Sequence, residues 1–208
     1  MNRWEFREVV MATGNKGKLR ELAVLLEPLG VKVLSPEECG IQGLHVEETG
    51  ETFEQNAVIK ALAYCRASGI AAIADDSGLC VDALDGAPGV YSARFGGPGL
   101  SDRERLELLL RRMKDLELEK RGAHFTSAIA LALPDGGGFV VTGECYGIIA
   151  LEPSGEGGFG YDPIFFYAPE GCTFADMSEE TKNRVSHRAV AMRLLVEQLE
   201  RSRENADK

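Results

Sequence analysis

Two adjacent carboxylates, Asp75 and Asp76, are the side chains of this sequence with the clearest capacity for chemistry. They come directly after the apolar run of residues 70–74, which has the length and composition of a buried strand. The end of a strand would hold both carboxylates at the edge of a sheet and point them to opposite sides. One carboxylate can then bind Mg²⁺ together with water and phosphate oxygens, while the other activates water. The letters Asp-Asp-Ser-Gly also suit a simple turn, so the pair alone leaves both interpretations open.

A second acidic group lies just before a predicted helix. Its members are Glu47, Glu48 and Glu51. Thr52 and Gln55 form a capping box, which predicts a helix from there to residues 68–69. Asn56 and Lys60 are four residues apart and would share one face of this helix. Oxygen ligands and a lysine suit a metal–phosphate site, whereas glutamates before a helix can also simply complement its dipole.

The loop of residues 13–18 follows a short apolar run and precedes leucines at helical spacing. Its residues are Thr13, Gly14, Asn15, Lys16, Gly17 and Lys18. A Walker A loop would need Gly in place of Ala12 and Ser or Thr in place of Leu19, so this loop is not one. Free N–H groups at the start of a helix and two ammonium groups still suit phosphate. A plain polar turn is the alternative interpretation.

Residues 155–160 match the pattern G-x-G-x-x-G. A dinucleotide-binding loop opens a helix directly after a strand, whereas here a strand-like run, residues 163–167, follows. The dinucleotide interpretation therefore fails, and what remains is a glycine loop that presents Phe159, Tyr161 and Asp162. An aromatic ring beside a carboxylate can stack on a purine and bind its edge, but a turn with core aromatics fits the pattern equally well.

Alternating strands and helices must position these groups. The sequence predicts strands at residues 9–12, 31–34, 70–74, 125–133, 139–146 and 163–167, and helices after residue 18, from 52, from 101 and towards the C-terminus. Ser101 with Glu104 forms a further capping box, and the last helix has an apolar face made of Val185, Ala189, Met192, Leu195 and Leu199. Interleaved elements with one antiparallel hairpin favour an α/β domain built on a mixed sheet. Open α/β sheets bind ligands where their strands end, which is where the polar clusters lie.

Composition narrows the class of protein. A chain of 208 residues suits one domain, residues 1–208, with frayed ends at 1–8 and 202–208. A net charge of −10 argues against a nucleic-acid-binding protein. No apolar run reaches the roughly 18 residues of a membrane span, and the first residues do not resemble a secretion signal. Five cysteines without a C-x-x-C pair suit a reducing compartment, so we expect a cytoplasmic protein with no membrane partner.

Seven segments, taken in order, resemble the inosine/xanthosine triphosphate pyrophosphatase family. They are residues 12–18, 47–50, 53–60, 74–79, 86–94, 157–165 and 186–188, and together they span nearly the whole chain. The resemblance implies an elongated single α/β domain with helices flanking a mixed central sheet, a deep nucleotide-binding cleft and a homodimer. It also implies hydrolysis of ITP, dITP and XTP to the monophosphate and pyrophosphate. A broader modified-nucleotide pyrophosphatase and a non-catalytic nucleotide-binding regulator are the alternatives.

The resemblance also implies the roles of single residues. Glu47 and Asp76 would hold Mg²⁺, and Asp76, assisted by Asp75, would accept the proton of the attacking water. Residues assigned to the triphosphate are Thr13, Gly14, Asn15, Lys16, Gly17, Lys18, Lys60 and Lys182. Ser77 would contact the substrate.

The purine base is assigned to a separate set of residues. Phe159, Gly160, Tyr161 and Asp162 would form its pocket, with the Phe159 ring stacked on the purine. His187 and Arg188 would meet the purine edge. A donor such as Arg188 is satisfied by the 6-oxo group of inosine or xanthosine but faces another donor in adenine. From spacing alone, His187 and Arg188 would pass for a structural histidine and a surface charge.

Overall fold

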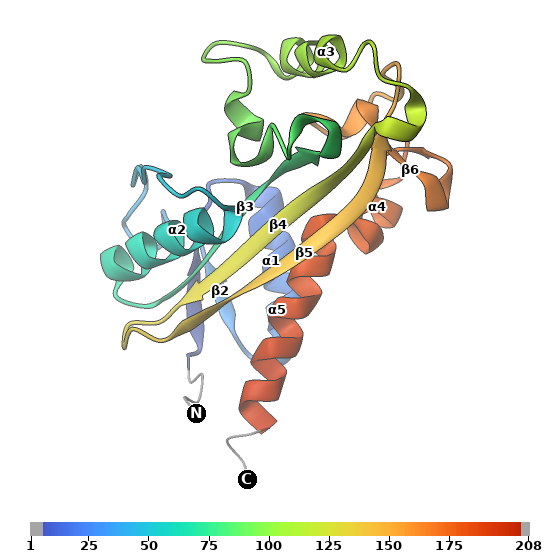
Figure 1. Ribbon diagram of the computed structural model, residues 1–208. Coiled ribbons are helices and arrows are strands. Elements are labelled where there is room, and N and C mark those ends of the chain that lie inside the picture. Colours follow the sequence, from blue (N-terminus) through green and yellow to red (C-terminus); the bar gives the residue numbers. More distant parts are fainter. Residues whose placement is uncertain (1–5, 205–208) are drawn as a thin grey trace. The chain divides into compact units, whose positions relative to one another are not determined.

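A seven-stranded mixed β-sheet with helices forms the structure, a computed structural model that describes residues 6–204 (Figure 1). The strands are β1 (Glu8–Met11), β2 (Lys32–Leu34), β3 (Ala71–Val81), β4 (Gly122–Ala132), β5 (Gly138–Ile149), β6 (Phe165–Tyr167) and β7 (Cys172–Thr173). The helices are α1 (Lys16–Leu26), α2 (Phe53–Ser68), α3 (Asp102–Arg112), α4 (Glu179–Val185) and α5 (His187–Glu204). The strand order is β2-β1-β3-β4-β5-β6-β7, with β1 parallel to β2 and β3, and β6 antiparallel to β5 and β7. The predicted α/β class with a mixed sheet is therefore confirmed.

The chain divides into two units that are described separately. Unit 1 comprises the residues up to Asp76, Ser127–Gly143 and the residues from Ala191 on, and unit 2 comprises Ser77–Thr126 and Glu144–Val190. Of the ends predicted to fray, residues 1–5 and 205–208 lie outside the described chain. Within the described chain, strand β1 begins at Glu8 and helix α5 continues to Glu204, so parts of both ends that were predicted to fray form regular secondary structure.

Unit 1 buries the two faces of its strands against different helices. Val9 and Met11 of β1 and Ile73 of β3 pack with residues of α1 and α5 in one apolar cluster. Val10 and Ala72 are fully buried but lie outside that cluster, because side chains alternate between the faces of a strand. In Figure 1, α2 covers the face of these strands opposite α1. Alternation along residues 71–76, the part of β3 that belongs to unit 1, thus assigns each of these side chains to the α1 face or to the α2 face.

Unit 2 has an aromatic core of its own. The rings of Phe165 and Phe174 have centroids 4.7 Å apart, and Phe125 lies 4.7 Å from Phe165 and 5.8 Å from Phe174. Leu106 and Leu109 of α3 are buried in the same cluster, as the helical spacing predicts. This core supports the loop of residues 157–162 and the start of α5.

The helix starts follow the predicted caps. In α3 both halves of the predicted capping box form: Ser101 accepts from the Glu104 N–H, and the Glu104 carboxylate accepts from the Ser101 N–H. In α2, Thr52 accepts from the Gln55 N–H, but the Gln55 side chain accepts from the Glu51 N–H instead of the Thr52 N–H. Gly69 ends α2 with φ 73°, a conformation that glycine adopts without strain.

The last predicted helix is in fact two helices. Ser186 has φ −65° and ψ 155°, which ends α4 at Val185, and its Oγ accepts from the Ala189 N–H at the start of α5. The predicted apolar face from Val185 to Leu199 therefore does not lie on one helix. Val185 belongs to α4, and the other predicted members belong to α5. Among the described residues, no helix is long and apolar enough to cross a membrane.

Candidate active site

Asp75 and Asp76 lie inside β3 and not at its end, which corrects the strand end predicted at residue 74. Side chains alternate along a strand, so Asp75, two residues after Ile73, lies on the same face as Ile73, which is the α1 face. Asp76 lies on the opposite face, which is the α2 face. The predicted opposite orientation of the two carboxylates is thus confirmed, and the alternative of a simple turn is wrong. Both carboxylates have a lysine partner, which is why the strand can continue through two acidic residues.

On the α1 face, Asp75 forms a buried ion pair with Lys18. The Lys18 Nζ lies 2.8 Å from Asp75 Oδ2, and the Asp75 side chain is only 5% exposed. Lys18 is the last residue of the phosphate-loop candidate and lies in the first turn of α1. Asp75 therefore fixes the position of one of the two lysines in that loop.

On the α2 face, Lys60 bridges two carboxylates. Its Nζ lies 3.3 Å from Asp76 Oδ1 and 2.9 Å from Glu48 Oε1. Burial lowers the pKa of Lys60, but the charges of Asp76 and Glu48 outweigh this, so its pKa lies above the ordinary value. Burial raises the pKa of the Asp76 carboxyl and Glu48 raises it further, while Lys60 offsets part of the rise. The cluster places two carboxylates around one ammonium in a partly buried position.

The donors at this cluster fit a hard divalent cation. Asp76 Oδ2 is buried and, within the described residues, has no hydrogen-bond partner, so it is available to a ligand. Mg²⁺ needs only one or two carboxylates, because water and phosphate oxygens complete its coordination. Among the residues that the structure describes, however, no group of three His, Cys, Asp or Glu is arranged to hold a metal without such additional ligands. Glu47, the predicted second ligand, is exposed, whereas its neighbour Glu48 reaches Lys60.

The loop of residues 13–18 forms a self-capped helix start. Asn15 Oδ1 accepts from the Gly17 N–H at 2.9 Å and from the Lys18 N–H at 3.2 Å, and the Asn15 N–H donates to Thr13 Oγ1. The expectation that these helix N–H groups are free is therefore wrong for Gly17 and Lys18, because Asn is a strong N-cap residue. Gly14, Asn15, Lys16 and Gly17 are exposed, so the loop remains accessible to an anion.

In unit 2, the glycine loop is organised around Asp162. This carboxylate is 4% exposed, accepts from the Phe159 N–H at 2.7 Å and forms an ion pair with Lys182. A side chain at Gly158, where φ is 73°, would collide with Asp162. The Lys182 ammonium also lies 5.1 Å from the centre of the Phe159 ring, which is 64% exposed. An exposed ring, a cation and a carboxylate thus lie together, a combination that suits a planar polar base.

Lys182 lies with the residues assigned to the base, although the resemblance assigns it to the triphosphate. Tyr161 has a structural contact instead of an exposed face: it is 5% exposed, and its hydroxyl donates to the Ser92 carbonyl at 3.0 Å. Burial raises the pKa of Tyr161 well above its ordinary value. Of this loop, Phe159 and Asp162 have the chemistry for a ligand.

His187 and Arg188 open helix α5. The His187 ring is 7% exposed and stacks on Phe125, with centroids 4.8 Å apart and planes 16° apart. Arg188 is half-buried, and so is Ser77 in β3. Stacking on the aromatic core fixes the His187 ring and with it the first turn of α5.

The predicted residues thus fall into two sets. Unit 1 contains Thr13, Gly14, Asn15, Lys16, Gly17, Lys18, Glu47, Lys60, Asp75 and Asp76, and unit 2 contains Ser77, Phe159, Gly160, Tyr161, Asp162, Lys182, His187 and Arg188. Within unit 1 the structure joins Lys18 to Asp75 and Lys60 to Asp76, and within unit 2 it joins Lys182 to Asp162. The role of Glu48 beside Lys60 was missed, since three neighbouring glutamates cannot be told apart by spacing.

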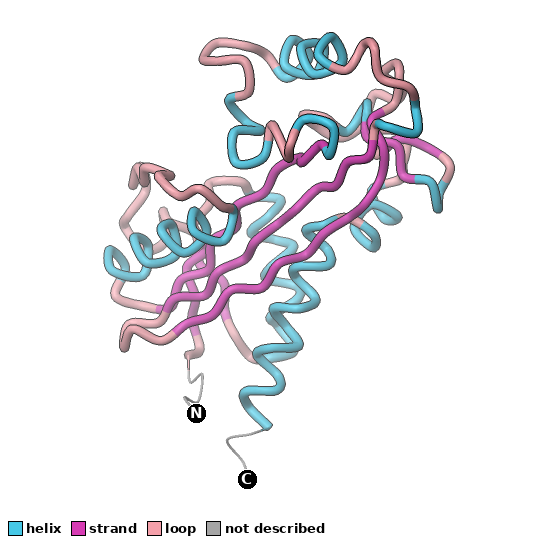
Figure 2. The backbone as a smooth tube through the Cα atoms, in the orientation of Figure 1, coloured by secondary structure: helices cyan, strands magenta, loops and turns pink. Residues whose placement is uncertain are grey.

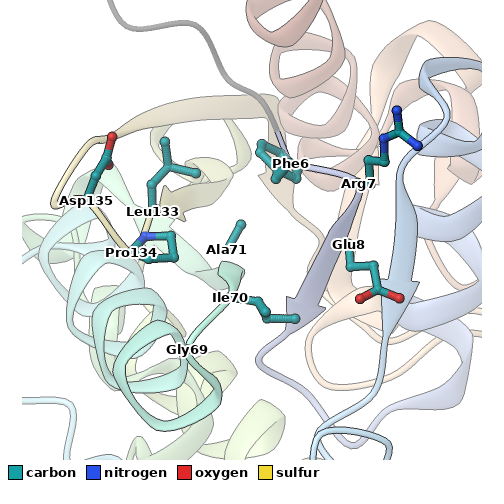
Figure 3. A pocket seen from close by; sticks show the side chains of 9 residues that line it. All are labelled: Phe6, Arg7, Glu8, Gly69, Ile70, Ala71, Leu133, Pro134 and Asp135. Atoms are coloured by element: carbon teal, nitrogen blue, oxygen red, sulfur yellow. The ribbon is translucent and has the colours of Figure 1, made fainter.

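A hollow of about 540 Å³ in unit 1 contains none of the predicted site residues (Figure 3). Its lining residues are Phe6, Arg7, Glu8, Gly69, Ile70, Ala71, Leu133, Pro134 and Asp135. It lies at the amino ends of β1 and β3, whereas the phosphate-loop candidate follows the carboxyl end of β1. Ligands of open α/β sheets bind at the carboxyl ends of the strands, so this hollow does not compete with the candidate site.

Comparison with known proteins gives similarity along almost the entire chain. The dITP/XTP pyrophosphatase of Yersinia pseudotuberculosis is 46% identical over 195 residues, which cover 93% of this chain and 98% of that protein. The dITP/XTP pyrophosphatase of Geobacter sulfurreducens is 48% identical over 191 residues, which cover 92% and 96%.

Solved structures show the same fold. The Ham1 protein of Staphylococcus aureus superposes with a TM-score of 0.87 at 41% identity, covering 93% of this chain and 98% of that one. The HAM1 protein of Coxiella burnetii superposes with a TM-score of 0.88 at 38% identity, covering 94% and 100%. The family model described as Ham1 family matches residues 9–198, which include every residue of both predicted sets. This chain belongs to the Ham1 family.

Proposed function

We propose that this protein hydrolyses the deaminated purine nucleotides ITP, dITP and XTP to the nucleoside monophosphate and pyrophosphate. The observation that carries the proposal is identity of 46–48% with proteins named dITP/XTP pyrophosphatase over more than nine tenths of the chain. The Glu48–Lys60–Asp76 cluster supports it, since a purely nucleotide-binding regulator has no need of carboxylates beside a polyanion. A non-catalytic role is therefore not favoured.

The residues of unit 1 act on the phosphates. Asp76 and Glu47 would hold Mg²⁺, which would supply a Lewis acid that offsets charge on the phosphate oxygens. Asp76 accepts the proton of the water that attacks the α-phosphorus. Lys18 and Lys60 stabilise the pyrophosphate as it leaves, and Asp75 assists by holding the Lys18 ammonium in place.

The phosphate loop contributes in a second way. Its glycines allow phosphate oxygens to approach the backbone, and Lys16 and Lys18 supply positive charge at the start of α1. Asn15 holds this helix start in shape through its two cap hydrogen bonds. The loop therefore offers a preformed anion-binding surface.

The residues of unit 2 select the base. Phe159 stacks on the purine, while Asp162 and Lys182 present a hydrogen-bonding pair beside it. His187 and Arg188 donate to the 6-oxo group. Adenine, with a 6-amino group, would leave these donors unpaired, which is how a closed site reaches high discrimination.

Four finer statements belong to the same proposal. The metal is Mg²⁺, the protein assembles as a homodimer, it acts on the cytoplasmic nucleotide pool, and it binds no nucleic acid. Support comes from the oxygen donors around Asp76 for the metal and from the net charge of −10 for the lack of nucleic-acid binding.

Product analysis tests the proposed function. The protein is incubated with ITP, XTP, GTP and ATP, with and without Mg²⁺, and pyrophosphate and orthophosphate are quantified separately. The proposal predicts pyrophosphate and IMP or XMP in equal amounts, only with metal, and kcat/KM for ITP at least about 100-fold above that for ATP. Release of orthophosphate as the first product would contradict it.

A further inference from the structure

Asn56 is a fully buried polar residue whose role the proposed reaction does not explain. It lies on α2 one turn before Lys60, has 0% exposure, and its Oδ1 accepts from the Gly50 N–H at 2.8 Å. Gly50 ends the stretch that carries Glu47 and Glu48, in the segment between β2 and α2. Residues 35–51 of that segment are all described and form neither helix nor strand (Figure 2). The buried Asn56 side chain therefore helps to fasten an irregular acidic loop to α2, together with the Gln55 and Lys60 side chains, which contact Glu51 and Glu48.

The contact at Gly50 is close. A Cβ at this position would lie 2.7 Å from Asn56 Oδ1 and 2.7 Å from Gln55 Cβ. Real side chains do not approach so closely, and neither neighbour is the free end of a flexible chain. Position 50 therefore requires glycine for the loop to reach Asn56.

The Asn56 amide lies on the face of α2 that also carries Lys60, the partner of Asp76. Asn56 Nδ2, a donor, and Asp76 Oδ2, an acceptor, are both buried, and neither has a hydrogen-bond partner of good geometry among the described residues. Lys60, one turn later on the same face, contacts the other oxygen, Oδ1.

We propose that Asn56 is a positioning residue that holds the Glu47–Glu48 loop and the Asp76 carboxylate in one fixed arrangement. Its carbonyl oxygen binds the loop at Gly50, and its NH₂ group orients Asp76 so that the carboxylate presents the correct geometry to a divalent cation. Hydrogen bonds from such outer residues fix the orientation of a metal-binding carboxylate and tune its affinity. This inference rests on the proposed function, because it concerns the same metal and phosphate site.

Three variants separate the role of Asn56 from general stability. Asn56→Leu keeps the approximate size but removes both polar groups of the amide, and Gly50→Ala displaces the loop without removing the amide. Gln55→Ala is the matched control, since Gln55 is the adjacent residue, is exposed and makes the same kind of bond to the next loop N–H, that of Glu51. Each variant is measured for thermal stability, for Mn²⁺ binding without nucleotide by electron paramagnetic resonance, and for kcat and KM with ITP.

The proposal predicts that Asn56→Leu binds Mn²⁺ about 10- to 100-fold more weakly and loses kcat by a similar factor, with KM changed much less. Gly50→Ala should shift Mn²⁺ binding in the same direction by a smaller factor, and Gln55→Ala should leave Mn²⁺ binding and kcat close to wild type. A folded Asn56→Leu protein with wild-type Mn²⁺ binding would overturn the proposal. If that variant does not fold, unchanged Mn²⁺ binding in Gly50→Ala would overturn it instead.

Failure of the proposed positioning role of Asn56 can be distinguished from failure of the proposed function. Absence of pyrophosphate release from ITP by the wild-type protein would refute the function. The Mn²⁺ measurements need no nucleotide and would still decide whether Asn56 positions the carboxylates.

Discussion

Asp75 and Asp76 are consecutive residues of β3, yet their carboxylates pair with lysines of different helices. Lys18 of α1 lies 2.8 Å from Asp75, and Lys60 of α2 lies 3.3 Å from Asp76. Strand alternation is the physical cause, because it directs the two side chains to opposite faces of the sheet. The two carboxylates therefore have different roles in the proposal: Asp75 fixes Lys18, the proposed phosphate-binding lysine, and Asp76 belongs to the Glu48–Lys60 cluster and has a buried oxygen without a hydrogen-bond partner among the described residues.

This division predicts unequal effects of removing the two charges. Asp76→Asn should lower kcat/KM for ITP by about 10²–10⁴-fold, because the proton acceptor is lost. Asp75→Asn should lower it by only about tenfold, through the less well fixed Lys18, and should cost roughly 1–3 kcal/mol of unfolding free energy. Steady-state kinetics and urea denaturation of both variants provide the comparison. Equal losses of kcat/KM in the two variants would argue against separate roles for Asp75 and Asp76.

The pH dependence of stability should report Asp76. Its pKa is raised in the folded protein, mainly by burial and then by Glu48 against the attraction of Lys60, so the folded state holds a proton that the unfolded chain releases. The free energy of unfolding should therefore fall as the pH rises from the ordinary carboxyl value of about 4 through the raised value, and remain lower above it.

The Asp76→Asn variant has no titrating carboxyl at position 76 and therefore serves as the control. In metal-free buffer its stability relative to wild type should improve as the pH rises from the ordinary carboxyl value of about 4 through the raised pKa of Asp76. Urea denaturation in the presence of a chelator measures the difference. A difference that does not vary with pH would show that the raised pKa of Asp76 has no energetic consequence.

Arg121 should be essential to unit 2. Its guanidinium is 2% exposed and donates to the backbone carbonyls of Met113, Ile149 and Ala150 at 2.7, 2.7 and 3.0 Å. Burial lowers the pKa of Arg121. Arg121→Met would remove the guanidinium donor from all three carbonyls, of which, among the described residues, only that of Met113 is shown to accept a further bond, from the Leu116 N–H at 3.0 Å, and we expect a cost of about 2–4 kcal/mol.

Arg111→Met, at an exposed position near the end of α3, is the matched control and should change stability by less than about 0.5 kcal/mol. Chemical denaturation followed by circular dichroism measures both variants. Similar stability of the two would mean that the three carbonyls find other donors.

Arg188 should determine base selectivity. Arg188→Ala should reduce the ratio of kcat/KM for ITP to that for ATP by about 10- to 100-fold, because the donor that adenine cannot satisfy is gone. Arg184→Ala is the control, since Arg184 lies four residues upstream, in α4, and forms a surface ion pair with Glu170. Competition kinetics with the two nucleotides gives the ratio directly, and an unchanged ratio in Arg188→Ala would remove this explanation of selectivity.

The local signals of the sequence were sufficient for the ends of α2 and α3, although not for the break between α4 and α5. Ser101 with Glu104, Thr52, and Gly69 mark the ends of α3 and α2 because caps depend on residues three or four positions apart. The phosphate loop shows the limit of such signals. Asn15 suits both a phosphate-binding loop and an N-cap, and the second use occupies the N–H groups predicted to be free.

Longer-range contacts explain what the sequence did not predict. The strand continues through Asp75 and Asp76 because lysines 57 and 16 positions away neutralise them, and no local pattern contains this information. Lys182 likewise meets Asp162 across 20 positions, a pairing that no local pattern predicts. Residue type thus identified the side chains of the candidate site. Which of them form ion pairs with each other could be seen only in the folded structure.

The most direct test of the account is hydrolysis of ITP in water labelled with oxygen-18. With Mg²⁺ present, IMP and pyrophosphate are separated and analysed by mass spectrometry. Attack of water on the α-phosphorus predicts one labelled oxygen in IMP and none in pyrophosphate. Label in pyrophosphate or in orthophosphate would place the attack on another phosphorus and contradict the account.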